Sequence, residues 1–111
     1  MVTIYHNPRC SKSRQTLDLI EQAGKAPDVV LYLKDKPSTE ILQKALEDIG
    51  RDKLLRTGED VYKDHIKDKD LSDKDLISII QEHPIVMERP LVINGDKMAL
   101  GRPPESVKEI L

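Results

Sequence analysis

The 111-residue chain has one cysteine, no phenylalanine and no tryptophan. A single cysteine excludes an internal disulfide, and with it the disulfide-stabilised secreted scaffolds and any redox mechanism that uses a second cysteine of the same chain. Because the only aromatic residues with large rings are three tyrosines, the core has to be built from aliphatic side chains. The length suits one core, and we predict a single domain over residues 1–111.

The sequence also lacks a long apolar run and an excess of positive charge. No uncharged apolar stretch is long enough to cross a bilayer, and the N-terminus lacks the basic-then-apolar order of a signal peptide. The net charge is −2, with Lys and Arg scattered among Asp and Glu, so the chain has no basic field for nucleic acid. We therefore predict a cytoplasmic protein that binds neither membranes nor nucleic acid.

The first third of the chain predicts a strand, a helix and a second strand. Residues 2–5 are apolar and β-branched and end at a His-Asn-Pro turn, which is typical of a short strand. Residues 11–23 carry apolar side chains at helical spacing, and Gly24 is suited to end that helix. Residues 29–33 form a continuous apolar run, which predicts a strand buried on both faces. Together these elements predict a right-handed βαβ unit.

Helices dominate the middle of the chain. Residues 38–50 and 72–83 each begin with a serine followed by acidic residues and carry an apolar face, which predicts two helices with serine N-caps. A shorter helical piece begins at Leu54. Residues 59–75 are crowded with Asp and Lys around a few apolar side chains, so most of this segment is predicted to be a solvated connection.

The last part of the chain predicts a β-hairpin and a helix. Residues 91–93 and 98–100 are two strand-like runs, and the Asn94-Gly95 pair between them is a strong hairpin signal. Pro103 then opens a terminal helix, because proline is tolerated in a first helical turn. The order of βαβ, helical insert and ββα predicts a thioredoxin-like α/β fold, in which helices flank a four-stranded mixed sheet.

Cys10 stands directly before the first predicted helix. At this position its sulfur faces the unpaired N–H groups and the positive end of the helix, both of which favour a thiolate. Ser13 completes a Cys-x-x-Ser sequence and supplies a hydroxyl that can donate a hydrogen bond to the thiolate. A lone cysteine is often a small buried apolar residue, but polar neighbours such as His6 favour a reactive one. The sequence does not favour a cysteine phosphatase, because the Cys-x5-Arg motif of those enzymes would need arginine where Thr16 stands.

Three arginines are candidates for an oxyanion site. Arg89 and Arg102 each precede a proline, which favours extended backbone and displays the side chain from a loop. In a thioredoxin-like domain the proline that opens the hairpin is commonly cis and lies against the redox cysteine, and Pro90 is that candidate. Arg56 lies near a helix end. Three guanidinium groups that converge on Cys10 would match the oxygens of a tetrahedral dianion.

Four segments together resemble the glutaredoxin-coupled arsenate reductase family, in the same order and along essentially the whole chain. They are HNPRCSKSRQTL, LLRTGED, HPIVMERPLVING and LGRPPESVKEIL. The resemblance implies that Cys10 is the nucleophile and that Arg56, Arg89 and Arg102 bind the oxyanion. It also implies that His6 is a supporting residue next to the cysteine, outside the set that contacts the substrate.

The same resemblance implies an activity and its partners. The expected reaction is the reduction of arsenate to arsenite through a covalent cysteine–arsenate adduct, with glutathione as co-substrate, glutaredoxin as partner and no bound cofactor. His6, His65 and His83 are too dispersed in the sequence to predict a metal site. The sequence shows no obvious dimer face, so we predict a monomer. One departure from many family members is Ser11-Lys12, where they have Gly-Thr.

Two alternatives remain open on the sequence alone. A monothiol glutaredoxin-like oxidoreductase would need Cys10 and would not need the arginines. A non-catalytic regulator of the same fold would bind a protein such as RNA polymerase, but relatives of that kind typically carry Cys-x-x-Cys, and Ser13 argues against it.

Overall fold

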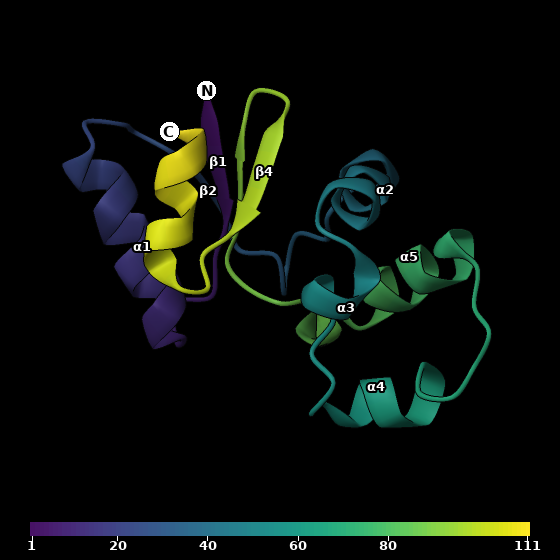
Figure 1. Cartoon of the computed structure of the whole chain (residues 1–111). Helices are drawn as coiled ribbons and strands as arrows, with labels where there is room; N and C mark the ends of the chain where they lie inside the picture. The colour runs from purple at the N-terminus through teal and green to yellow at the C-terminus, as the bar shows by residue number, and fades with distance from the viewer. The chain divides into compact units, whose positions relative to one another are not determined.

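The computed structural model describes residues 1–111 and divides the chain into two compact units. The first unit combines Met1–Asp35 with Arg89–Leu111, and the second is Lys36–Glu88 (Figure 1). The single domain expected from the length stays a prediction. Across both units, every helix is too short or too polar to span a membrane.

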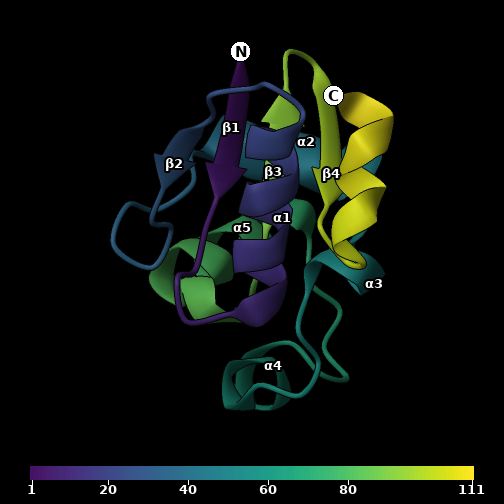
Figure 2. The same cartoon turned by 90° about the vertical axis from the view of Figure 1, so that its left-hand side faces the viewer.

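The first unit is built on a four-stranded sheet whose strands are short. They are β1 (Val2–Tyr5), β2 (Asp28–Val30), β3 (Leu91–Asn94) and β4 (Lys97–Leu100). The spatial order is β2-β1-β3-β4, with β1 parallel to β2 and antiparallel to β3, and with β3 antiparallel to β4. The register pairs Ile4 with Val92 at the centre of the sheet. The predicted mixed sheet and hairpin are confirmed (Figure 2).

Two helices, α1 (Ser11–Gln22) and the terminal 3-10 helix η2 (Pro104–Ile110), pack side by side against this sheet (Figures 1 and 2). Their contact buries an aliphatic core made of Val2, Ile4, Ile20, Val92 and Val107. Gly24, with φ of +80°, lies just beyond the end of α1, as its position in the sequence predicted. The core fixes α1 on the sheet, and its first turn therefore lies near the carboxyl end of β1.

The second unit is helical. Its elements are α2 (Thr39–Asp48), α3 (Arg51–Leu54), α4 (Asp60–His65), α5 (Asp73–Glu82) and the 3-10 helix η1 (Pro84–Val86). The two predicted serine caps are confirmed, because Ser38 Oγ accepts the N–H of Ile41 and Ser72 Oγ accepts that of Asp75. An isolated bridge joins Leu55 to Met87, and both residues are buried.

The predicted strand over residues 29–33 is wrong in length and burial. β2 ends at Val30, and the chain then turns, with the N–H groups of Lys34 and Asp35 both donating to the carbonyl of Leu31 at 2.9 Å. The physical reason is that β2 is an edge strand, paired on one side only. Tyr32 is fully buried, whereas Val29 is 47% exposed, so the apolar run does not mark a strand buried on both faces.

Three helical predictions also need correction. The segment 59–75 contains α4, anchored by buried Ile66, whose N–H donates to the Tyr62 carbonyl at 3.0 Å. Ile66 is the one buried residue of this segment, so the segment is solvated as predicted but contains a helix that was not. The short helix α3 ends at Leu54, where the sequence predicted a helical piece to begin. The terminal helix is confirmed in place but has 3-10 geometry over Pro104–Ile110.

Candidate functional site

Cys10 is the N-cap residue of α1. Its φ of −94° and ψ of 122° are those of an extended residue that precedes a helix, and its carbonyl accepts the first helical hydrogen bond, from Arg14 N–H at 3.0 Å. Its own N–H donates to the Asn7 carbonyl at 3.0 Å, which closes the turn after β1. No side chain caps the helix, and the thiol is half-buried. The sulfur therefore stands at an open, positively polarised helix start.

Arg102 approaches the sulfur from the far end of the sequence. Its Nη2 donates to Cys10 Sγ over 3.7 Å, and its Nε donates to the Arg89 carbonyl at 2.8 Å. The guanidinium is thus held by one nitrogen while another faces the sulfur. Both Arg89–Pro90 and Arg102–Pro103 are cis peptide bonds. The cis peptide bond predicted before Pro90 is confirmed. The sequence analysis did not predict the second cis bond, before Pro103.

A hydrogen-bonded group made of His6, Asn7 and Ser13 lies beside the cysteine turn. His6 Nδ1 lies 2.6 Å from Ser13 Oγ, and the Asn7 N–H donates to the same oxygen at 3.1 Å. Both His6 and Ser13 are buried. Ser13 Oγ therefore accepts a hydrogen bond from Asn7 and shares one with His6, and its predicted hydrogen bond to the Cys10 thiolate stays a prediction.

The charge state of His6 follows from its surroundings. Burial lowers the pKa of His6 below its ordinary value of 6.5, and the positive charge of Arg14 lowers it further. Arg14 is itself fixed, because its Nη1 donates to the Pro8 carbonyl at 2.8 Å. Neutral imidazole with its proton on Nδ1 would donate to Ser13, which would leave the hydroxyl proton of Ser13 for another acceptor.

Arg56 belongs to the second unit, and two carboxylates of that unit hold it. Its Nη1 lies 2.8 Å from Glu59 Oε1, and its Nε lies 3.6 Å from Glu88 Oε1. Its backbone N–H donates to the Val86 carbonyl at 2.7 Å. Its predicted convergence with Cys10 stays a prediction. Neither glutamate was singled out in the sequence, although Glu59 stands three residues after Arg56, within reach of an ion pair.

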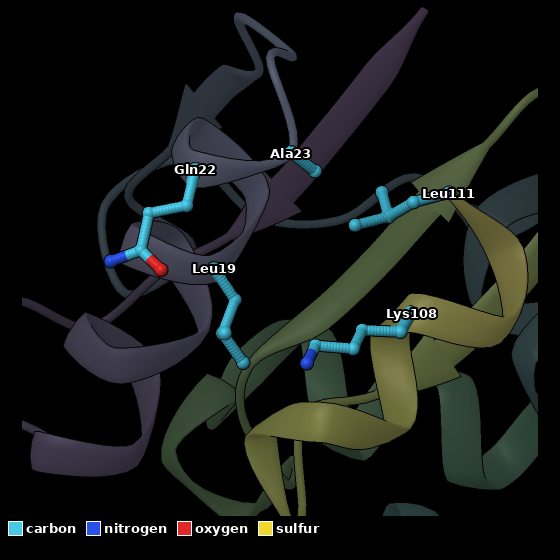
Figure 3. Close-up of a pocket in the computed structure, with 5 residues that line it drawn as sticks. All are labelled: Leu19, Gln22, Ala23, Lys108 and Leu111. Atoms are coloured by element: carbon cyan, nitrogen blue, oxygen red, sulfur yellow. The ribbon is translucent and has the colours of Figure 1, made fainter.

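A pocket of about 300 Å³ lies in the first unit between α1 and η2 (Figure 3). Its lining is Leu19, Gln22, Ala23, Lys108 and Leu111. Leu19 and Lys108 point toward one another across it (Figure 3). Because α1 rises about 1.5 Å per residue, the residues that α1 contributes lie more than about 13 Å along the helix from Cys10. At that distance the pocket is separate from the cysteine site. Its walls are mostly apolar, and Lys108 is their one charged side chain.

The histidines do not gather at the cysteine. The rings of His65 and His83 stack in the second unit with centroids 5.4 Å apart, a contact that their separation in the sequence did not suggest. No group of three or more His, Cys, Asp or Glu side chains in residues 1–111 is arranged to hold a metal ion. The expectation that no metal takes part stays a prediction.

The fold and the position of Cys10 define the class of protein, a thioredoxin-like α/β protein with a cysteine at the start of its first helix. The chain matches the ArsC family over residues 5–110. It is 47% identical to an arsenate reductase of Haemophilus influenzae, over 99% of this chain and 98% of that protein. It is 45% identical to the uncharacterized protein YfgD of Escherichia coli, over 99% of this chain and 96% of that protein.

A solved structure of an arsenate reductase from Vibrio cholerae superposes with a TM-score of 0.91 at 45% identity, covering 99% of this chain and 97% of that one. The chain therefore belongs to the ArsC family. This membership confirms the family resemblance of the four sequence segments and the thioredoxin-like fold that they implied.

Proposed function

We propose that this protein reduces arsenate to arsenite, with Cys10 as the nucleophile. The observation that carries the proposal is the 3.7 Å contact between Arg102 Nη2 and Cys10 Sγ at an uncapped helix start. A thiolate there is stabilised by the helix end and by a guanidinium, and the same two groups suit an incoming oxyanion. Membership in the ArsC family and the arsenate reductase named at 47% identity support the choice of arsenate.

The first chemical step is attack of the Cys10 thiolate on As(V). An As–S bond forms, an As–O bond breaks, and the departing oxygen leaves as water after protonation. Arg102 would stabilise the negative oxygens of the adduct, with Arg89 beside it on the adjoining loop. Arg56 enters this proposal as the third arginine from the family resemblance alone.

The electrons in the proposed reaction come from thiols. Glutathione attacks the cysteine–arsenic adduct, and arsenite leaves as Cys10 and glutathione form a mixed disulfide, so that two thiols supply the two electrons that As(V) gains. Glutaredoxin then reduces that mixed disulfide and returns Cys10 to the thiol. An external thiol is required because Cys10 is the only cysteine in the chain. The proposed reaction uses no bound cofactor.

Phosphate provides a way to separate binding from chemistry. It has the tetrahedral shape and charge of arsenate, and a guanidinium site would bind both. Thiols do not reduce phosphate, so we expect it to act as a competitive inhibitor with no turnover. Inhibition by phosphate with unchanged kcat would support an oxyanion site formed by the arginines.

The test is arsenate-dependent oxidation of NADPH in a coupled assay with glutathione, glutaredoxin and glutathione reductase. We expect activity in the wild type, none in Cys10→Ser, and a strong loss in Arg89→Ala. Arg51→Ala is the matched control, because Arg51 is an exposed arginine that pairs with Asp73 at 2.6 Å and has no role in the proposed reaction. Full activity in Cys10→Ser would refute the proposal.

The same assay distinguishes the rival oxidoreductase. A monothiol glutaredoxin-like enzyme would reduce a glutathione mixed disulfide, would be indifferent to Arg89→Ala and would show no dependence on arsenate. That combination of results would replace the proposal with the rival function.

A further inference from the structure

We propose that Gly101 is a positioning residue: the absence of a side chain at this residue lets the loop after β4 pack against α1 and so places Arg102 at Cys10. Gly101 is buried between the end of β4 and Arg102. Its N–H donates to the Pro90 carbonyl at 2.9 Å, which extends the β3–β4 ladder by one hydrogen bond. The residue that follows is the arginine that faces the sulfur.

The space around Gly101 excludes even a methyl group. A Cβ added there would lie 2.8 Å from Pro90 Cγ, 2.9 Å from Thr16 Cγ2 and closer still to Thr16 Oγ1. Carbon atoms in good contact are about 3.5–4.0 Å apart, so neighbouring groups would have to move by roughly 1 Å. The φ angle of Gly101 is not in the left-handed region, so the requirement is for space.

The neighbours of Gly101 have little freedom to move away. Thr16 is fully buried in α1, and its hydroxyl donates to the Lys12 carbonyl at 2.8 Å, one turn before it. Pro90 is a ring fixed between Arg89 and the first residue of β3. The movable part is therefore the loop of Gly101 and Arg102. A shift of about 1 Å in that loop away from α1 would lengthen the 3.7 Å contact between Arg102 and Cys10 beyond hydrogen-bonding range.

This role deepens the proposed function and rests on it for its significance, but its test does not require arsenate. The measurement is the rate at which iodoacetamide alkylates Cys10 at pH 7. Because the thiolate is the reacting form, loss of the guanidinium contact slows alkylation near neutral pH. We expect Gly101→Ala to slow alkylation at pH 7 by about tenfold, the scale of losing one hydrogen bond to a charged group.

Rescue separates positioning from general damage. Thr16→Ala removes both Thr16 atoms that the new methyl would meet, the closest one included, and leaves Pro90 Cγ at 2.8 Å. Gly101→Ala/Thr16→Ala should therefore recover part of the lost alkylation rate. Thr16→Ala alone measures the cost of losing the threonine without the collision. Gly58→Ala is the folding control, because nothing lies within 4 Å of a Cβ at Gly58, and its Tm should equal or slightly exceed that of the wild type.

The outcomes are distinct. A folded double variant that recovers none of the rate lost in Gly101→Ala overturns the proposal, as does a folded Gly101→Ala that alkylates at the wild-type rate. If Gly101→Ala alone does not fold, the double variant still decides, because it removes two of the three atoms that the methyl would meet, the closest one included. In the arsenate assay, the KM for arsenate should rise more than kcat falls in Gly101→Ala. A wild type without arsenate reduction would refute the proposed function and leave the alkylation test of Gly101 intact.

Discussion

Helix α1 of the first unit begins without a side-chain cap, whereas α2 and α5 of the second unit each begin with a serine that caps them. Cys10 makes no capping hydrogen bond, but Ser38 and Ser72 accept N–H groups of their own first turns. The charges differ in the same sense. The first turns of α2 and α5 contain acidic residues, and that of α1 contains none.

This difference separates helix starts that serve stability from one that serves chemistry. A serine cap and an early acid satisfy the N–H groups and the positive dipole of a helix from within the chain. At α1 these groups stay available to a thiolate or to an anion that approaches Cys10. Helix α1 therefore lacks the stabilising side-chain cap that α2 and α5 both have.

The largest expected effect comes from replacing Cys10 with serine, which removes the nucleophile and gives α1 a side-chain cap. Cys10→Ser should abolish arsenate reduction, because the nucleophile is gone, and should raise the free energy of unfolding by about 0.5–1 kcal/mol, because serine is a good N-cap. Urea unfolding measures the second effect. Cys10→Ala is the control that removes the thiol without adding a cap. A Cys10→Ser protein less stable than Cys10→Ala would show that α1 has no capping deficit.

The next effect concerns the charge at the open helix start. Arg102→Ala should lower kcat/KM for arsenate by about 100-fold, the scale of losing a charged donor of an oxyanion site. Arg102→Lys should recover only part, because lysine keeps the charge and lacks the forked geometry that also reaches the Arg89 carbonyl. Steady-state kinetics in the coupled assay give the result. Equal activity in the lysine and wild-type proteins would mean that charge alone suffices.

A smaller effect is expected when the second unit loses its caps. Ser38→Ala and Ser72→Ala should each lower the free energy of unfolding by about 1 kcal/mol. Because neither serine belongs to the proposed machinery, kcat/KM for arsenate should stay at its wild-type value. Ser38→Asp, which retains a capping oxygen, is the matched control and should keep wild-type stability. Loss of activity in either alanine variant at full folding would break the division between the two kinds of helix start.

The smallest effect is a pH dependence that arises beside the cysteine. Since burial and Arg14 lower the pKa of His6, the unfolded chain binds more protons than the folded one as pH falls below 6.5. The stability contribution of neutral His6 is therefore complete above that pH, shrinks as pH falls toward the folded pKa, and then levels off. Between pH 7 and 5.5, His6→Gln should lose less stability than the wild type, by at most about 1 kcal/mol. Identical losses in urea unfolding would contradict this.

Several features of both units were predictable because their signals are local. The two serine caps, the Asn94-Gly95 hairpin and the position of Cys10 before α1 each depend on a few adjacent residues and a known backbone preference. The contact between Cys10 and Arg102 was predictable only through the family resemblance, since 92 residues separate the partners. Local pattern carries no information on which distant loop meets a given helix.

The errors have physical causes of the same kind. An apolar run at residues 29–33 does not state whether a strand has one neighbour or two, and β2 has one. The charged sequence showed no sign of α4, because none of its residues is buried and it therefore has no apolar face to reveal its period. The packing of Gly101 against Thr16 depends on atoms brought together by the completed sheet. The pairing of Arg56 with Glu59 and Glu88 required side-chain geometry that spacing alone does not determine.

The shortness of β2 bears on how the protein behaves at high concentration. An edge strand exposes a row of unpaired N–H and C=O groups to which another chain can add, and short edge strands are one way in which proteins prevent this. β2 offers only the three residues Asp28–Val30 before the backbone turns at Leu31. Val29 and Leu33 expose apolar surface nearby. The early end of β2 therefore limits the length of backbone that this edge of the sheet presents to another chain.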